Sequence, residues 1–483
     1  MSSKVILLSI LYLGFLIGVL KKVRRQDHLS ANKFLFLDGR VGPWLSFFGI
    51  SATLFSTFTL MGMPAFFRNH GIAAWVFLGV TDVCLAGILL GGGLWLRKRA
   101  SALDKAAPEK KSHYNITRLL SLSGTRRWVI WVYVFSNTLF LLPYLTIQIK
   151  GAATLFQSAV PVGGTPLFWS ILFVFVLFLY SAFGGIRAIY LTDTVQGIVL
   201  FAVVYIVSGY ILNETQGIYG LFAQINEKRP DLLTPPGPSG LLGVQFLLLS
   251  FISICAMPFV QPQLATRVLL VDKHTNFVRT TMGLGVFAFL VILPTMVIGL
   301  YGSSFSGQGP SGFLPELLTE TVPPWVHAAF VVGVMAAAMS TTDSQLMAIG
   351  TEWSSALNKT HDNSMYISKT TVKWVSFILA MLALVLAQTD FRSLVLFAIN
   401  SFIGTSLLLP IILTAILQTR GAIFAQTLAA GSIILFAAKL FQFLPKTWWF
   451  DLRMELWLYM ISWGTSLALI LFNWKFKKSL AAD

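Results

Sequence analysis

The sequence predicts an all-α polytopic membrane protein with about 13 transmembrane helices. Hydrophobic residues make up 56% of the chain, charged residues only 11%, and the mean hydropathy is +0.75. A soluble domain carries roughly 25% charged residues. At 483 residues, the chain has room for a dozen or more spans of about 20 residues each.

Thirteen apolar segments follow one another along the chain. They are residues 4–20, 43–67, 71–96, 128–157, 165–185, 190–212, 240–270, 278–305, 325–357, 370–389, 392–418, 421–443 and 455–474. Several exceed about 25 residues, so we expect them to tilt, break or extend beyond the bilayer. The first segment resembles a signal sequence, but its basic residues follow the apolar run and no A-x-A cleavage site is present. We therefore expect it to remain as a span.

The net charge of +16 is concentrated in alternate loops. If the N-terminus lies outside, the cytoplasmic segments hold most of the 35 Lys and Arg residues. This positive-inside bias predicts an integral, multi-pass protein of the plasma (inner) membrane, with the N-terminus outside and the C-terminus cytoplasmic. It also assigns the basic charge to contact with the lipid bilayer rather than with nucleic acid.

The second and seventh segments are interrupted by polar residues and prolines. Segment 43–67 has a run of hydroxyl residues followed by Gly62 and Pro64, and segment 240–270 contains Pro258 and Pro262. In lipid, backbone groups freed by a break must be satisfied by protein or by a water-filled cavity. Interrupted helices at matching places in two halves indicate a transporter site. Two ordinary proline kinks are the alternative.

These two segments are five spans apart, and a repeat of five spans, an odd number, must be inverted relative to its copy. We therefore expect the first repeat at residues 43–212 and the second at 240–418. Residues 1–42 are expected to form the first transmembrane helix and a basic cytoplasmic linker. Residues 419–483 are expected to form two C-terminal helices and a basic tail.

The ninth segment carries a polar stripe. Ala337, Ser340, Thr341 and Ser344 fall on one face of a helix at ~100° per residue. The hydroxyls offer hard oxygen ligands, and Asp343 at the flank brings an ionisable group to membrane depth, where such a residue is a functional hypothesis by default. The alternative is helix packing, because small and hydroxyl residues are common between membrane helices.

The sequence AAAMSTTDSQL at Ala336–Leu346 resembles the signature helix of the sodium:solute symporters, the family of the sodium/proline, sodium/glucose and sialic acid cotransporters. Three other stretches agree in order and spacing: Leu37–Trp44, Gly184–Gly197 and Phe259–Arg267. The resemblance covers roughly residues 1–440. It implies a leucine-transporter-type five-plus-five inverted repeat, alternating access and sodium coupling.

The resemblance also implies a sodium (Na+) site with five oxygen ligands. Two are backbone carbonyls of the second segment, and one carbonyl and two hydroxyls come from the ninth: Ala52, Phe55, Ala337, Ser340 and Thr341. Some family members have a second sodium site at the position of Asp193, for which Ser340, Asp343 and Ser344 are the expected neighbours. The alternative for Asp193 is a carboxylate stabilised by the helix macrodipole.

Candidate solute contacts are polar side chains near the two interruptions and on the fourth segment: Thr53, Ser56, Thr57, Gln148, Gln245, Gln261 and Gln263. For each glutamine the alternative is an interhelical hydrogen bond. The sodium/proline branch has an acidic residue at the position of Leu54, and aromatic residues at the positions of Ile254 and Pro258. A proline-type pocket is therefore not expected.

These features predict sodium-coupled secondary active symport of a small organic solute, of the amino acid, carboxylate, sugar or vitamin class. No H-E-x-x-H, G-x-S-x-G or paired acidic motif is present, so we do not expect an enzyme. Two alternatives remain open. One is a non-transporting solute sensor on the same fold, and the other is a proton-coupled symporter in which Asp193 or Asp343 titrates.

Overall fold

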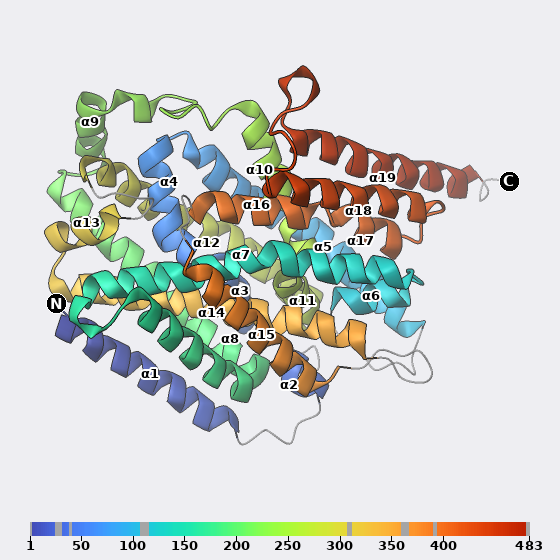
Figure 1. Ribbon diagram of the computed structural model, residues 1–483, viewed down its shortest axis with the longest axis horizontal. Helices are drawn as coiled ribbons and strands as arrows, with labels where there is room; N and C mark the ends of the chain where they lie inside the picture. Colours follow the sequence, from blue (N-terminus) through green and yellow to red (C-terminus); the bar gives the residue numbers. More distant parts are fainter. Residues whose placement is uncertain are drawn as a thin grey trace.

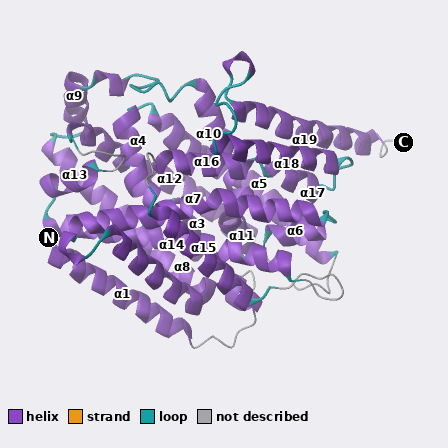
Figure 2. Cartoon of the chain, in the orientation of Figure 1, coloured by secondary structure: helices purple, strands orange, loops and turns teal. Residues whose placement is uncertain are grey.

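The computed structural model describes residues 2–24, 31–37, 41–106, 115–306, 312–358, 367–389 and 394–479, and these are almost entirely helical (Figure 1, Figure 2). Part of the motif Leu37–Trp44 lies outside the described residues. The α-helices are α1 (Ser2–Arg24), α2 (Ala31–Phe36), α3 (Pro43–Leu54), α4 (Met63–His70), α5 (Thr81–Lys105), α6 (Ile116–Leu122), α7 (Arg127–Ala159), α8 (Pro166–Glu214), α9 (Ile218–Lys228), α10 (Val244–Val260), α11 (Pro262–Leu270), α12 (His274–Tyr301), α13 (Phe313–Thr321), α14 (Pro324–Leu357), α15 (Lys369–Ala387), α16 (Leu394–Ser406), α17 (Leu409–Ile416), α18 (Ala422–Leu440) and α19 (Met454–Ser479).

The predicted all-α membrane fold is confirmed. Within the described ranges, ten helices are long and apolar enough to cross a membrane, and two bent helix pairs bring the number to twelve. The shorter apolar helix Pro166–Leu179 corresponds to the remaining predicted segment, 165–185. The thirteen predicted segments therefore each coincide with a helix, part of a helix or a bent pair.

The fifth and sixth predicted segments form one continuous element, α8, of 49 residues. At ~1.5 Å per residue this exceeds twice the thickness of the hydrocarbon core. The element bends at Gly185, where φ is +59°, a left-handed conformation that favours glycine. A Cβ at Gly185 would lie 2.7 Å from the carbonyl oxygen of Phe34. The bend therefore separates two spans, as the sequence predicts.

The first bent pair consists of α3 and the segment Phe58–His70, which are inclined by 52°. α3 ends at Leu54, and Phe55 has an extended backbone with φ −96° and ψ 107°. The break therefore precedes Gly62 and Pro64, which both lie in helical segments. Pro64 lies inside the continuous segment Phe58–His70, just after a π-helical turn at Phe58–Gly62, and the helix continues through it. Hydroxyl residues, rather than the proline, mark this break.

The second bent pair consists of α10 and α11, which are inclined by 56°. The break is at Gln261, whose backbone is extended with φ −82° and ψ 124°. Pro262 follows at the start of α11, and a residue that precedes proline is disfavoured in the helical region. Here the proline in the sequence does mark the break, and the two interrupted spans are five apart as predicted.

Helix α14 runs through the centre of the bundle. It packs against α1, α3, α7, α8, α11 and α15 (Figure 1). Most of its side chains are buried, including every residue from Ala336 to Thr351. A polar group on this helix is therefore enclosed by protein. The assignment of the two repeats to residues 43–212 and 240–418 stays a prediction.

The two termini, which the sequence places on opposite membrane faces, lie at opposite ends of the bundle. In Figure 1, α9, α13 and the N-terminus are at the left end, whereas α6 and the C-terminus are at the right end. This arrangement agrees with an odd number of spans. The direction of the bundle relative to the membrane stays a prediction.

Gly49 on α3 is required by close packing. A Cβ at this position would lie 2.3 Å from Tyr190 Cε1 and 2.6 Å from Arg267 Nη1. We expect Gly49→Ala to destabilise the fold by about 1–3 kcal/mol, because overpacking forces neighbours out of position. The measurement is the thermal unfolding midpoint in detergent. Gly87→Ala in α5 is the control, since a Cβ there meets no atom within 4 Å. Equal midpoints for the two variants would contradict the close approach.

Candidate functional site

The backbone at the break after α3 is satisfied by side chains. The N–H of Ser56 donates to Thr59 Oγ1 at 3.0 Å, and the N–H of Phe58 donates to Ser56 Oγ at 3.1 Å. The N–H of Thr57 donates to Gln148 Oε1 on α7 at 3.1 Å. In a continuous helix these donors would bond carbonyls four residues earlier. Those carbonyls, just before the break, are therefore released from the helical ladder.

One of the released carbonyls, that of Ala52, meets the polar stripe of α14. Ser340 Oγ lies 2.9 Å from the carbonyl oxygen of Ala52 and 3.0 Å from that of Ala337. Thr341 Oγ1 is buried and has no hydrogen-bond partner among the described residues. Phe55 is at the break itself, and the Thr59 N–H that would bond its carbonyl donates instead to Ser56 O at 2.9 Å.

This oxygen set fits a small hard cation. The groups are neutral carbonyls and hydroxyls, the ligands that transporters use for Na+ at broken helices. A buried hydroxyl without a partner costs about 1–3 kcal/mol, and an ion beside Thr341 would remove that cost. The structure thus brings Ala52, Ala337 and Ser340 together, and it places Thr341 and Phe55 on the same two elements.

Most of the side chains predicted to contact the solute near the break form hydrogen bonds within the protein instead. Thr53 Oγ1 donates to the carbonyl of Gly49 in its own helix at 2.9 Å. Ser56 Oγ is 2.9 Å from the Tyr144 hydroxyl, and Thr57 Oγ1 is buried with no described partner. Gln148 makes the interhelical hydrogen bond that the sequence offered as the alternative.

The three glutamines of the seventh segment do not lie together. Gln263 Nε2 donates to Gln261 Oε1 at 2.8 Å, and Gln261 Nε2 lies 3.3 Å from Thr405 Oγ1 on α16. Gln245 is at the other end of α10, about 24 Å along the helix axis. Its side chain accepts from the N–H of Arg453 at 2.8 Å, in the segment before α19. Gln245 is therefore remote from the break.

Asp193 on α8 is joined to Arg267 on α11. Arg267 Nη2 lies 2.7 Å from Asp193 Oδ2 and also donates to Ser344 Oγ. Ser344 Oγ in turn donates to Asp343 Oδ1 at 3.1 Å. The guanidinium lies 4.9 Å from the centre of the Tyr190 ring. The structure therefore brings Asp193, Asp343 and Ser344 together, around an arginine that was not among the residues predicted for this site.

The charges of this network do not balance. Asp193 and Asp343 are both fully buried, and one carboxylate oxygen of each has no partner among the described residues. One guanidinium compensates only one of two carboxylates. Because an unpaired buried charge is very costly, a further cation or a proton is required.

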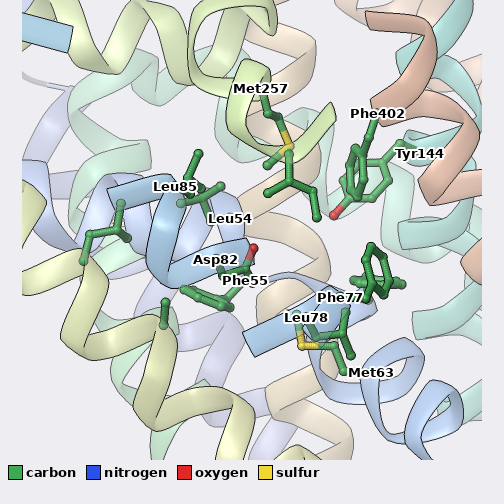
Figure 3. Close-up of a pocket in the computed structure, with 14 residues that line it drawn as sticks. Leu54, Phe55, Met63, Phe77, Leu78, Asp82, Leu85, Tyr144, Met257 and Phe402 are labelled. Atoms are coloured by element: carbon green, nitrogen blue, oxygen red, sulfur yellow. The ribbon is translucent and has the colours of Figure 1, made fainter. Parts of the chain in front are cut away.

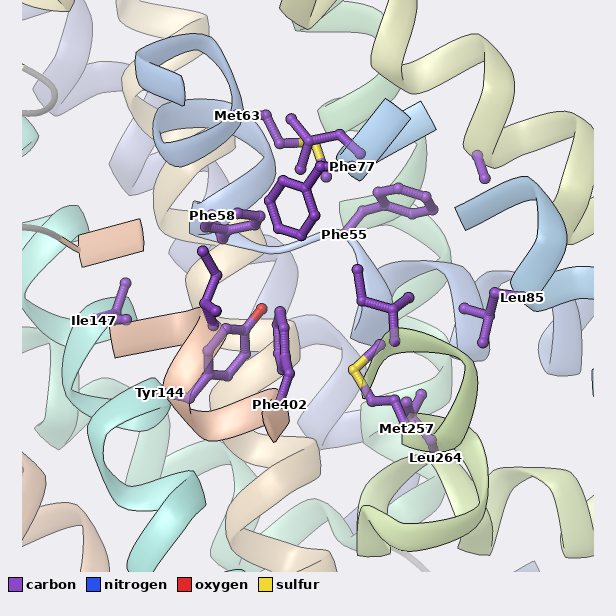
Figure 4. Packing of buried hydrophobic residues seen from close by; sticks show 14 of the residues in the cluster. Phe55, Phe58, Met63, Phe77, Leu85, Tyr144, Ile147, Met257, Leu264 and Phe402 are labelled. Atoms are coloured by element: carbon purple, nitrogen blue, oxygen red, sulfur yellow. The ribbon is translucent and has the colours of Figure 1, made fainter. Parts of the chain in front are cut away.

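A cavity lies beside the break after α3, between α5, α7, α10, α12 and α16 (Figure 3). Of the fourteen lining side chains, only Asp82 and Tyr144 are polar. Aromatic and methionine side chains around this space belong to the main buried cluster of the protein (Figure 4). Phe55 contributes its side chain to the cavity, close in sequence to the Ala52 carbonyl that meets α14.

Asp82 was not among the residues predicted for the site, although the sequence carried a signal for it. Asp82 is the only acidic residue in the predicted segment 71–96, and an ionisable residue within a span is a functional candidate by default. Tyr144 gave no such signal. Its place in the cavity depends on the fold, because it comes from α7, far from the break in sequence.

The sequence profile of the sodium:solute symporter family matches residues 34–428. The chain belongs to this family. It is 25% identical over 357 residues to the sodium/pantothenate symporter of Haemophilus influenzae, covering 72% of this chain and 70% of that protein. It is also 25% identical over 428 residues to the high-affinity proline transporter PutP of Bacillus subtilis, covering 83% and 86% respectively.

The fold is similar to that of a Na+-coupled sialic acid symporter solved in a substrate-bound, outward-open state. The TM-score is 0.74 at 16% sequence identity, and the match covers 97% of both chains. The family and the leucine-transporter-type fold expected from the motifs are thus confirmed. The individual ligand assignments are not tested by these similarities and stay predictions.

Gln148 supports the break through its bond to Thr57, so its loss has a specific effect on stability. We expect Gln148→Leu to destabilise the protein by about 1–3 kcal/mol, because a buried N–H loses its acceptor. The measurement is again the thermal midpoint in detergent. Gln388→Leu is the matched control, because Gln388 is exposed and bonds within its own helix. A drop of equal size in both variants would contradict the role of Gln148.

Proposed function

We propose that this chain couples sodium influx to the uptake of a small organic solute, with Na+ bound by Ala52, Phe55, Ala337, Ser340 and Thr341. The observation that carries this proposal is the contact of Ser340 Oγ with the Ala52 carbonyl, 2.9 Å apart, at a helix break. A break that exposes carbonyls to a hydroxyl stripe on a central helix is the arrangement expected of an ion site in a transporter.

The energetics favour coupling through this site. One sodium ion that moves inward down a potential of ~100 mV releases about 2.3 kcal/mol. The ion would hold the α3 break against α14 and so stabilise one arrangement of the two elements. Since Phe55 also lines the cavity, sodium and solute would act on the same backbone segment. Differential binding of this kind is what allows one ligand to change the affinity for the other.

The solute binds, in this proposal, in the cavity beside the break. The relatives named above are symporters of pantothenate and proline by name, and the proposed class here is likewise a small organic molecule. The protein is proposed to lie in the plasma (inner) membrane, with its N-terminus outside and its C-terminus in the cytoplasm, because of the positive-inside bias of its loops.

A second cation is proposed at Asp193, Asp343 and Ser344. The support is the charge imbalance around Arg267, together with the partnerless carboxylate oxygens. Sodium satisfies both carboxylates and the Ser344 hydroxyl. A proton on Asp343 is the alternative, and it would make the protein partly proton-coupled.

The sodium site is tested by substitutions that remove single hydroxyls. Ser340→Ala and Thr341→Val each delete one ligand and leave the ion partly dehydrated. We expect the sodium concentration for half-maximal thermal stabilisation to rise about tenfold or more, since ligand binding to the native state raises its stability. Sodium is titrated against potassium at constant ionic strength with the purified protein.

Thr342→Val is the matched control for these variants. Thr342 is equally buried, but its Oγ1 donates to the carbonyl of Ala338 in its own helix at 2.6 Å. This variant should keep the wild-type sodium dependence. Equal half-saturating sodium in Ser340→Ala, Thr341→Val and wild type would remove the site assignment.

The second cation is tested with Asp343→Asn. Equilibrium binding of radioactive sodium to the purified protein should show one fewer bound ion per chain than in wild type, because the network then carries no excess negative charge. Asp272→Asn, in the loop before α12, is the control for a change of charge alone. Unchanged stoichiometry would contradict a second sodium ion and favour a proton on Asp343.

A further inference from the structure

The cavity beside the break has an unusual chemical composition for a site that admits polar solutes. Five of its fourteen lining residues are aromatic: Phe55, Phe58, Phe77, Tyr144 and Phe402. The others are aliphatic or methionine, apart from Asp82. No Lys, Arg or His is among these lining residues. The cavity therefore offers apolar surface, aromatic side chains and one carboxyl group.

Asp82 has no protein partner for its carboxylate. None of the ion pairs or hydrogen bonds between described residues includes it. The residue is half-buried and projects from α5 into the space that Figure 3 shows, where the Tyr144 hydroxyl also lies. A carboxylate at membrane depth that only packed the helices would be expected to pair with a neighbouring donor.

The other polar group of the cavity is already engaged. The Tyr144 hydroxyl is 2.9 Å from Ser56 Oγ, and the Tyr144 ring lies 5.4 Å from the Phe402 ring. The Tyr144 hydroxyl is therefore occupied, and Asp82 supplies the one carboxyl group among the lining residues. Aromatic faces attract organic cations, and a carboxylate beside them suits a cation such as an ammonium group.

We propose that the solute of this transporter is an organic ammonium compound without a free carboxylate, bound with its ammonium group against Asp82 and among the aromatic faces. This inference rests on the proposed function of the cavity as the solute site. A carboxylate-bearing solute would approach Asp82 without any basic lining residue to compensate it, and like charges are repelled at low dielectric. The inference therefore excludes a pantothenate-like anion, in contrast to one of the named relatives.

The cavity is tight in this conformation. Its free volume is about 30 Å³, enough for one or two water molecules rather than a solute. Met63 and Met257 line it, and methionine side chains can change shape at low cost. Admission of the ammonium compound therefore involves movement of these side chains, together with the neighbouring break.

The experiment uses purified full-length protein at saturating sodium, with thermal stabilisation as the readout of binding. The ammonium probes are methylammonium, tetramethylammonium and choline. The neutral isostere of choline, 3,3-dimethylbutan-1-ol, tests for charge, and glycine betaine tests for tolerance of a carboxylate. We expect at least one of the ammonium probes to bind. If choline is the probe that binds, its affinity should be at least about tenfold higher than that of its neutral isostere and of betaine.

Asp82→Asn should weaken binding of the effective ammonium probe at least about tenfold and leave the isostere unaffected. Asp82→Glu should restore part of the affinity. Glu227→Gln is the matched control, because it removes an exposed carboxylate on α9. It should bind the probes as wild type does.

Three results overturn the inference. They are no stabilisation by any ammonium probe, equal binding of the neutral isostere or of betaine, and unchanged ammonium binding in Asp82→Asn. Failure of the proposed function is a different result in the same experiment. It appears as the absence of any stabilisation by sodium over potassium, in wild type and in Asp82→Asn alike.

Discussion

A break in a membrane helix depends on hydrogen bonds that water cannot supply. At the break after α3, three successive N–H groups are satisfied by side chains. Two of them donate to hydroxyls of the same segment, those of Thr59 and Ser56, and the third donates to Gln148 of α7. The freed carbonyls are treated differently. That of Ala52 meets Ser340, a hydroxyl that can serve equally as a ligand beside an ion. The donors are therefore fixed by the protein, whereas the acceptors remain suited to a cation.

The same segment connects the two sites. The carbonyl of Ala52 meets Ser340 of α14, while the Phe55 side chain lines the cavity. An ion at the Ala52 carbonyl and a solute in the cavity would therefore both act on the backbone of the short segment from Ala52 to Phe55. Because α14 is buried on all sides and packs against both halves of the bundle, a shift of the break relative to α14 would be transmitted to the surrounding helices.

The helices and the stripe on α14 could be predicted from sequence, because both depend on local periodicity in apolar and hydroxyl residues. The position of the first break could not. Pro64 drew attention to the wrong place, because the helical segment Phe58–His70 continues through it. Gln245 was chosen because it is polar within an apolar segment, but α10 begins only at Val244, so Gln245 is near the helix start and bonds a distant loop. Its partners are more than 200 positions away in sequence.

Arg267 is a second residue whose contact could not be predicted from the sequence, because its partner is far away along the chain. The residue stood in a recognised motif, yet its pairing with Asp193 joins positions 74 residues apart. Without that contact, Asp193 would be available as a ligand for sodium. With it, Arg267 compensates one of the two carboxylates, and a further cation or a proton would balance the charge of the other, which Asp193 and Asp343 share. Arg267 also links α11 to α8 and α14, so any rearrangement of the second broken helix must carry or break a buried charge contact. Such contacts are poor sources of net stability. If a second cation binds beside Asp193 and Asp343 as proposed, it would compete with Arg267 for these carboxylates, and the arrangement of α8, α11 and α14 would then depend on whether the cation is bound.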